Sequence, residues 1–333
     1  MHTGPRDSEW KGRTVLLTGA QGFIGSWLAE RLLDAGARVV ALRRDVEPQA
    51  RFVADGIQDR CVVVPADITD YAELVRALNE HQVDSVFHLA AQTIVGIANH
   101  SPLSTFETNI RGTYMLLEAC RTVSVTGDPI RRVVVASSDK AYGAHDQLPY
   151  TEELALNARY PYDVSKACAD LIARSYAAMW GLPVAVTRIA NVYGGGDLNW
   201  SRLIPGTARA LMDGSPPVIR SDGSPERDYL YVDDAIDAYL AVAASLSSAQ
   251  RAGRAWNAGW GEPHPVREVV DRLVAASGVD VESEVRGEGV PRGEIDRQSL
   301  DASELERALG WRPKVGLDEG LRRTWEWYRR RLA

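Results

Sequence analysis

A tyrosine and a lysine stand four residues apart where a helix is predicted to begin. The segment Tyr160–Lys166 reads YPYDVSK, and Pro161 suits the first helical position. Residues four apart share one helix face, so Tyr162 and Lys166 would lie side by side. A phenol titrates at about pH 10 in water, but an ammonium group and a helix N-terminus stabilise its phenolate form. The spacing is therefore that of a tyrosine base, although the pattern alone is common.

A glycine-rich turn near the N-terminus indicates a dinucleotide site. The β-rich run Thr14–Thr18 leads directly into Gly19, and two more glycines follow at Gly22 and Gly25. Glycines three apart at a strand-to-helix turn let the backbone approach a pyrophosphate, and the helix N-terminus supplies free N–H groups. The turn follows the first strand of a β–α–β pattern, which is the context that this motif requires. The expected cofactor-binding residues of the turn are Gly19, Gly22, Phe23, Ile24 and Gly25.

The end of the second predicted strand bears on the choice between NAD and NADP. An acidic side chain there would accept hydrogen bonds from a ribose 2′-hydroxyl, whereas an arginine would suit a 2′-phosphate. The sequence reads Leu42-Arg43-Arg44-Asp45. NADP is favoured if Arg43 and Arg44 hold that place, NAD is favoured if the turn brings in Asp45, and both arginines could instead be solvated loop residues. Asp67, after the third strand, is placed to reach the adenine.

Short apolar runs alternate with helix-length segments through the first half of the chain. Continuous Val- and Leu-rich runs suit strands covered on both faces, and helices between them imply right-handed crossovers and a parallel sheet. The strands are predicted at Thr14–Thr18, Arg38–Leu42, Cys61–Val64, Asp84–Leu89, Arg132–Ser137 and Val184–Ile189, and helices at Gly22–Ala35, about Pro102–Thr122 and Pro161–Trp180. The predicted fold class is α/β, a Rossmann-type doubly wound parallel sheet.

The alternation of predicted strands and helices ends after about Asn191. Glycine and proline become frequent, as in Gly194–Asp197 and Asp213–Pro217, and helical segments dominate. We expect residues 1–190 to form an NAD(P)-binding Rossmann domain, to which some later segments return. Residues 191–333 are expected to form a smaller, mainly helical substrate lobe, interleaved with the first domain.

Composition limits the classes of protein that the chain can be. It has 333 residues, a net charge of 38 − 45 = −7 and 45% hydrophobic residues, which excludes disorder or a coiled coil as the main state. The acidic balance argues against nucleic-acid or membrane partners. With no signal-like apolar segment and with Cys61, Cys120 and Cys168 lacking CxxC spacing, we expect a cytoplasmic protein with reduced thiols. No metal is expected, because no cluster has metal-ligand spacing.

Several motifs together resemble the extended short-chain dehydrogenase/reductase family of nucleotide-sugar enzymes, over nearly the whole chain. They are Thr18-Gly19-x-x-Gly22-Phe23-Ile24-Gly25, His88-Leu89-Ala90-Ala91, Tyr162-x-x-x-Lys166, Arg227-Asp228-Tyr229-x-x-Val232-x-Asp234 and Leu309-Gly310-Trp311-x-Pro313. The resemblance implies a Rossmann domain that binds NAD or NADP and a C-terminal lobe that holds a nucleotide-diphosphate sugar. It also implies that Tyr162 takes a proton from a sugar hydroxyl, usually at C4, while C4 delivers a hydride to the nicotinamide.

The resemblance assigns roles to further residues. Lys166 would bond the nicotinamide ribose and lower the pKa of Tyr162. Either Ser137 or Ser138 would bond the sugar oxygen that is oxidised, and Asn109 would help to organise the site. Further cofactor contacts are expected from Ile68, Leu89, Ala90 and Ala91.

The two residues after the Ser137–Ser138 pair bear on the reaction. In the family, 4,6-dehydratases carry an acid–base pair where Asp139 and Lys140 stand, and simple 4-epimerases carry small or hydroxyl residues. Oxidation at C4 acidifies the C5 proton, so a base can remove it while an acid protonates the departing C6 oxygen. Asp139 would be the acid and Lys140 a candidate base, although a lysine base must be neutral and Lys140 could instead only orient the substrate.

The sequence therefore predicts a nucleotide-sugar 4,6-dehydratase. The alternatives are a nucleotide-sugar epimerase that acts through a keto-sugar intermediate and, in a different class, a non-catalytic Rossmann sensor protein. Some stretches look like those of CDP-glucose 4,6-dehydratases, whereas the Arg43-Arg44 pair looks like that of GDP-mannose 4,6-dehydratases, which use NADP.

Substrate contacts and assembly complete the predictions. A guanidinium group matches phosphate geometry, which makes the arginines of the second half candidate clamps. The expected substrate-binding residues are Ser137, Asn191, Trp200, Arg202, Arg227 and Arg292. The resemblance also implies a homodimer that pairs helices at about Pro102–Thr122 and Pro161–Trp180.

Overall fold

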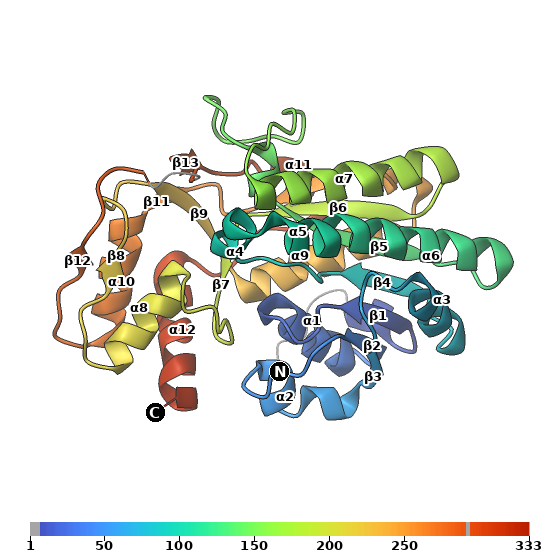
Figure 1. Ribbon diagram of the computed structural model, residues 1–333, viewed down its shortest axis with the longest axis horizontal. Coiled ribbons are helices and arrows are strands. Elements are labelled where there is room, and N and C mark those ends of the chain that lie inside the picture. Colours follow the sequence, from blue (N-terminus) through green and yellow to red (C-terminus); the bar gives the residue numbers. More distant parts are fainter. Residues whose placement is uncertain (1–6, 291–293, 333) are drawn as a thin grey trace.

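A seven-stranded parallel sheet forms the larger part of the molecule (Figure 1). The computed structural model describes residues 7–290 and 294–332. The strand order is β3-β2-β1-β4-β5-β6-β10. The bounds are β1 Thr14–Thr18, β2 Arg38–Arg43, β3 Val62–Pro65, β4 Ser85–His88, β5 Arg132–Ser138, β6 Val184–Ile189 and β10 Ala255–Ala258. The order reverses between β1 and β4, and open α/β sheets bind ligands at the carboxyl ends of their strands beside such a point.

Helices cover both faces of this sheet, which confirms the predicted Rossmann-type fold (Figure 1). One face packs against α3 (Tyr71–Glu80), α6 (Gly112–Thr126) and α7 (Pro161–Trp180), and the other against α1 (Phe23–Asp34) and α9 (Val232–Ser245). Alternate strand residues serve opposite faces because the side-chain period of a strand is two. Leu16 of β1 thus joins one core cluster while its neighbours Val15 and Leu17 join the other.

The helix predicted at about Pro102–Thr122 is interrupted. It consists of α5 (Pro102–Phe106), a π-helical turn at Glu107–Arg111 and then α6. Asn109 lies within the π turn, and its amide bonds both the backbone N–H and the carbonyl of Gln92 in the loop after β4. π turns are frequent at functional sites, and hydrophobic spacing alone could not reveal this one.

The smaller lobe is built from short strands and three long helices. Strand β9 (Glu226–Tyr231) pairs with β7 (Asn191–Tyr193), β11 (Pro263–Pro265) and β13 (Arg297–Gln298). Helix α10 (Val266–Ser277) packs against α8 and α12 (Figure 1). The remaining elements of the lobe are α8 Leu203–Met212, β8 Val218–Ile219, β12 Glu284–Val285, α11 Ser303–Leu309 and α12 Leu317–Leu332. Two segments of the second half belong to the larger part: α9 packs on one face of the seven-stranded sheet, and β10 is its edge strand next to β6.

Two aspartates of the Arg227–Asp234 motif hold loops of the chain in place. The buried Asp228 carboxylate accepts hydrogen bonds from the backbone N–H groups of Trp260, Gly261 and Leu300. Burial raises the pKa of Asp228 to about 6, although these N–H groups oppose the rise. Asp234 likewise accepts from the N–H groups of residues 314 and 315. This motif therefore carries structural anchors beside the arginine predicted to bind substrate.

The remaining elements of the chain are short. They are η1 Asp7–Trp10, α2 Arg51–Ala54, η2 Ile57–Arg60, α4 Val95–His100, η4 Asp139–Tyr142 and η5 Ala249–Arg251. Among the described residues, no helix combines the length and the apolar character that crossing a membrane requires.

Candidate active site

The glycine-rich turn has the shape of a dinucleotide cradle. Gly19 has φ +74°, and a Cβ there would stand 2.7 Å from the backbone nitrogen of Ala90. A Cβ on Gly25 would collide with the carbonyl oxygen of Gly19. No side chain caps the N-terminus of α1 at Gly22, so its first N–H groups stay available to an anion. These residues fit a nicotinamide dinucleotide.

The residues predicted to meet the adenosine end surround the carboxyl ends of β2 and β3. Arg43 donates from Nη1 to Oε1 of Gln58 at 2.9 Å, and the exposed Arg44 pairs with Asp45 at 2.6 Å. Asp67 accepts two hydrogen bonds from Thr69. Burial acts to raise the pKa of Asp67, but these bonds outweigh it and the pKa is lowered. Neither arginine is held in a fixed position toward a 2′-phosphate.

A hydrogen-bonded chain runs across the sheet behind the cradle. The Thr18 hydroxyl accepts from the N–H of Ala90 and lies 2.8 Å from Nδ1 of His88. Nε2 of His88 lies 3.0 Å from the Thr113 hydroxyl, which donates to the carbonyl of Asn109. Because the Thr113 hydroxyl donates its only proton to that carbonyl, it accepts from Nε2 of His88. His88 therefore carries its proton on Nε2 and accepts at Nδ1. Burial, with a smaller contribution from the Lys166 charge, lowers the pKa of His88 to about 3.

The chain continues from Asn109 to the helix that carries the tyrosine and the lysine. The Asn109 amide donates to the Ser165 hydroxyl at 2.9 Å, and Ser165 donates to the carbonyl of Tyr162 at 2.6 Å. Lys166 is buried and donates from Nζ to the carbonyl of Ala136 at 2.8 Å. Burial lowers the pKa of Lys166 to about 8. Asn109 thus bonds the helix turn that carries Lys166, and Lys166 bonds the carboxyl end of β5.

The Tyr162 phenol interacts with a cation that the sequence did not assign to it. Burial raises the pKa of Tyr162, and Arg202 is the nearby cation that opposes the rise, helped by an interaction with the Ser138 hydroxyl. Lys166 points instead at a backbone carbonyl of β5. Arg202 is fixed by Asp197 at 2.9 Å and by the Thr93 hydroxyl at 3.2 Å. The predicted phosphate clamp therefore lies beside the predicted base in this structure.

Asp139 is a buried acid of the site. It is buried on η4, next to the N-terminal turn of α7. Its Oδ1 accepts from the Ser138 hydroxyl at 2.8 Å, and its Oδ2 is buried without a hydrogen-bond partner among the described residues. Burial raises the pKa of Asp139, against the smaller opposing effects of Lys140 and Arg227. A buried carboxyl group of this kind suits a general acid.

The smaller lobe contributes charged side chains to the surroundings of Asp139 and Lys140. Nζ of Lys140 lies 3.9 Å from Oε2 of Glu294, and Nη2 of Arg227 donates to the same oxygen at 2.9 Å. Arg227 also donates to the carbonyls of residues 226 and 296. Nε2 of Gln298 in β13 donates to the Asp139 carbonyl at 3.5 Å, and its Oε1 is buried without a partner in the part of the chain that the structure describes. Glu294 and Gln298 were not predicted, because they lie far along the chain and match no motif that we recognised.

The other predicted substrate residues are spread around this cluster. Asn191 donates to the carbonyl of Asp228 at 3.4 Å, and the Ser137 hydroxyl donates to the carbonyl of Lys166 at 3.3 Å. Trp200 packs against the ring of Tyr328, with centroids 5.8 Å apart. Arg292 lies outside the described residues. The remaining cofactor candidates, Phe23, Ile24, Ile68, Leu89 and Ala91, are half-buried or buried.

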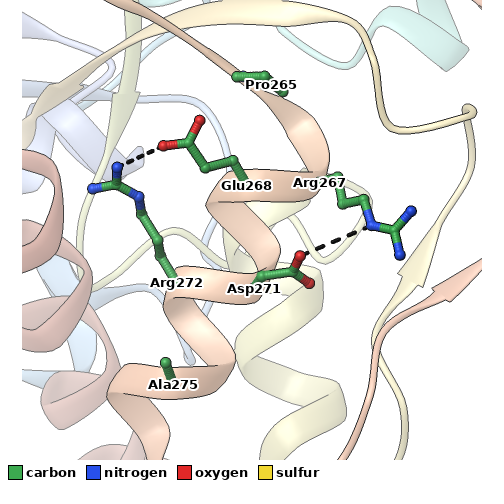
Figure 2. A pocket seen from close by; sticks show the side chains of 6 residues that line it. All are labelled: Pro265, Arg267, Glu268, Asp271, Arg272 and Ala275. Atoms are coloured by element: carbon green, nitrogen blue, oxygen red, sulfur yellow. Dashed lines mark ion pairs between the residues drawn. The ribbon is translucent and has the colours of Figure 1, made fainter.

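The surface hollow on α10 is separate from these residues. Figure 2 shows that it is lined by side chains of one helix and of the residue before it, with Glu268 paired to Arg272 and Arg267 to Asp271. None of the predicted site residues lines it. Across the described residues, no group of three or more His, Cys, Asp and Glu side chains is arranged to hold a metal ion.

The fold and the site define a Rossmann protein of the extended short-chain dehydrogenase/reductase class, with its Tyr–Lys pair at the end of the fifth strand. The sequence model of the GDP-mannose 4,6 dehydratase family matches residues 16–324. The chain therefore belongs to that family.

Individual relatives span both dehydratases and epimerases. The chain is 32% identical to the CDP-glucose 4,6-dehydratase of Salmonella typhimurium over 96% of this chain and 91% of that protein. It is 33% identical to the UDP-glucose 4-epimerase of Mycolicibacterium smegmatis over 95% of this chain and 98% of that protein. The solved dTDP-glucose 4,6-dehydratase of Streptomyces venezuelae, with NAD bound, matches at a TM-score of 0.85 and 34% identity, over 95% of this chain and 97% of the other.

His88 gives a pH-dependent prediction. Its pKa of about 3 in the fold lies below the value of about 6.5 in an unfolded chain. The unfolded state therefore binds the proton first, and stability is lost as the pH falls from about 6.5 toward 3. His88→Gln removes this titration, so the stability advantage of the wild type over the variant should shrink by about 2 kcal/mol between pH 7 and pH 5. Urea unfolding at both pH values measures the change.

Thr113→Val is the matched control, because it removes a hydrogen-bond partner of His88 and leaves the histidine in place. The loss of stability of Thr113→Val relative to the wild type should change much less with pH. If His88→Gln loses the same stability relative to the wild type at pH 7 and at pH 5, His88 is not a buried neutral histidine.

Proposed function

We propose that the protein is an NAD(P)-dependent nucleotide-sugar 4,6-dehydratase. The observation that carries the proposal is Asp139, a buried acid with an unpartnered oxygen, next in sequence to Ser138 and electrostatically coupled to Tyr162. Epimerisation at C4 needs a base for the hydroxyl but no acid for a departing oxygen, whereas dehydration needs both. The dehydratases among the relatives agree with this assignment.

The residues divide the reaction between them. Tyr162 removes the proton of the C4 hydroxyl, with Ser138 donating to the same oxygen and Arg202 stabilising the phenolate. The bound dinucleotide supplies the redox chemistry, in which C4 is oxidised first and C6 is reduced last. A C4 ketone acidifies the C5 proton, and the Asp139 carboxyl group protonates the C6 oxygen as water leaves. Lys166, whose Nζ bonds the Ala136 carbonyl in this structure, would hold the dinucleotide ribose.

We further propose that residues 1–190 bind the dinucleotide and that residues 191–333 hold the nucleotide sugar. Asn191, Trp200, Arg227 and Arg292 are the proposed substrate contacts of that lobe. Arg227 supports this because its guanidinium reaches the same cluster as Lys140, through Glu294. A location in the cytoplasm remains a prediction of the sequence.

The epimerase is the second candidate, favoured by the 33% identical UDP-glucose 4-epimerase. The products of the two reactions differ in mass. Dehydration removes one water from the sugar, whereas epimerisation gives an isobaric product. Incubation with CDP-glucose, dTDP-glucose, UDP-glucose and GDP-mannose, each with NAD or NADP, should give loss of one water from at least one sugar in mass spectra.

Tyr162→Phe tests the base in the same assay. The variant lacks the hydroxyl that takes the C4 proton, so turnover should fall by about 10²- to 10⁴-fold, while dinucleotide binding, followed by tryptophan fluorescence, is retained.

Each assay has an outcome that contradicts the proposal. If the wild type gives only isobaric products, the protein is not a dehydratase. Full turnover by Tyr162→Phe would remove Tyr162 from the catalytic role.

The preference for NADP rests on Arg43 and Arg44. Because Arg44 is exposed and paired only with its neighbour Asp45, it can turn toward a 2′-phosphate at small cost. Arg44→Ser should weaken NADP binding by about tenfold, the order expected for loss of one charge-assisted hydrogen bond, and should leave NAD binding unchanged. Titration calorimetry with both dinucleotides measures this. Tighter NAD than NADP binding by the wild type would contradict the preference.

We propose a homodimer through the outer surface of α5, α6 and α7. Large apolar side chains are exposed there, an arrangement that marks association surfaces. They are Leu103, Tyr114, Val125, Leu171, Met179 and Trp180. Light scattering should therefore show a dimer, and Leu171→Glu combined with Met179→Glu should give a monomer. Val46→Glu, at another exposed apolar residue, is the control that should stay dimeric. A monomeric wild type at micromolar concentration would contradict the proposal.

A further inference from the structure

Asp163 is a buried carboxylate that none of the roles above uses. It follows Tyr162 on the first turn of α7 and is only 4% exposed. Within residues 7–290 and 294–332, its side chain makes no hydrogen bond and no ion pair within 4 Å. Burying an unpaired carboxylate costs free energy, and such groups cluster where they serve chemistry. An acid in a first helical turn is otherwise common, so the argument depends on what surrounds Asp163.

The charged groups around Asp163 are those of the reaction site. The charges of Lys140 and Asp139 on η4, and of Glu294 in the smaller lobe, all act on the Asp163 carboxylate. Its own charge acts in turn on the Tyr162 phenol. Burial is the largest effect and raises the pKa of Asp163 to about 6, with Lys140 opposing the rise and the two carboxylates adding to it. Asp163 is therefore ionised at neutral pH.

The positions of Tyr162 and Asp139 define where the sugar carbons would lie. Under the proposed function, Tyr162 acts at the C4 hydroxyl and Asp139 at the C6 oxygen. C5 lies between C4 and C6, so the base that acts on C5 must be near both side chains. Asp163 meets this condition, because it lies on the first turn of α7, the helix that packs against η4, and its charge acts on both Tyr162 and Asp139.

Lys140 meets the condition less well. Its ammonium group is drawn to Glu294 of the smaller lobe, 3.9 Å away, and also faces Asp139 and Asp163. In these interactions Lys140 acts as a cation beside acids, whereas a lysine base must be neutral. This setting suits a cation that balances the acids of the site.

We propose that Asp163 is the base that removes the C5 proton during dehydration. The inference rests on the proposed function. The C5–H bond breaks, its proton passes to the Asp163 carboxylate, and its electron pair forms the C5–C6 double bond. The C6–O bond breaks with its electron pair on oxygen, which takes the proton of Asp139 and leaves as water. The step involves no net oxidation or reduction.

Exchange of hydrogen at C5 separates the roles of the two aspartates. In D₂O with CDP-glucose, dTDP-glucose, UDP-glucose or GDP-mannose, whichever the wild type dehydrates, Asp163→Asn should lower both C5 deuterium incorporation and water loss by about 10²- to 10⁴-fold. Oxidation at C4 should remain, seen as a rise in reduced-nicotinamide absorbance. Asp139→Asn should block water loss while the recovered sugar still gains deuterium at C5, because its base is intact. NMR and mass spectrometry measure both quantities.

Lys140→Gln is the matched comparison, and it should keep at least tenfold more C5 exchange than Asp163→Asn. The wild type provides a second measurement that needs no variant, since its exchange rate should fall below pH of about 6 as Asp163 is protonated. Exchange by Asp163→Asn within threefold of the wild type, or equal losses of C4 oxidation and exchange, would overturn the assignment. A wild type that dehydrates none of the four sugars would instead reject the proposed function, and the role of Asp163 with it.

Discussion

The hydrogen-bonded chain from Thr18 to Tyr162 is the interaction on which the site depends. It starts at the end of β1, passes through the neutral His88 of β4, and reaches α7 through Thr113, Asn109 and Ser165. Each donor in it has one acceptor, so the tautomer of His88 and the orientation of the Asn109 amide are both determined. The dinucleotide cradle and the helix that carries the base are thereby linked through side chains of β4, the π turn and α6.

Buried charge couples the two parts of the molecule around this framework. Asp139 and Asp163 belong to the Rossmann part, whereas Glu294 and Arg227 belong to the smaller lobe. Lys140 pairs with Glu294 across the boundary. In a low-dielectric setting, the pKa of each acid depends on whether the opposite charge is near. A movement of the smaller lobe would therefore change the proton affinities of both aspartates as well as access to them.

The sequence predicted local features well and long-range partnerships poorly. The strand runs, the glycine turn and the helix at Pro161–Trp180 follow from spacing and turn chemistry within a few residues, and the structure confirms them. The π turn at Asn109 was missed because it is set by the loop after β4. The effect of Lys166 on Tyr162 stays a prediction, whereas the large effects of burial and of Arg202 on the Tyr162 pKa depend on folded positions that the sequence does not reveal.

Asp163 shows why a residue can be visible in a motif and still be overlooked. In sequence it fills an unremarkable place between Tyr162 and Lys166, where an acid suits the first turn of any helix. Its environment separates it from that role, since the carboxylate is buried, is subject to the Asp139 charge, and forms no hydrogen bond with the residues that the structure describes. Two carboxyl groups in one site can serve as acid and base when their surroundings hold their proton affinities apart. Here the deeper Asp139, with one oxygen unpartnered, is suited to keep its proton, and Asp163, beside Lys140, to give its proton up.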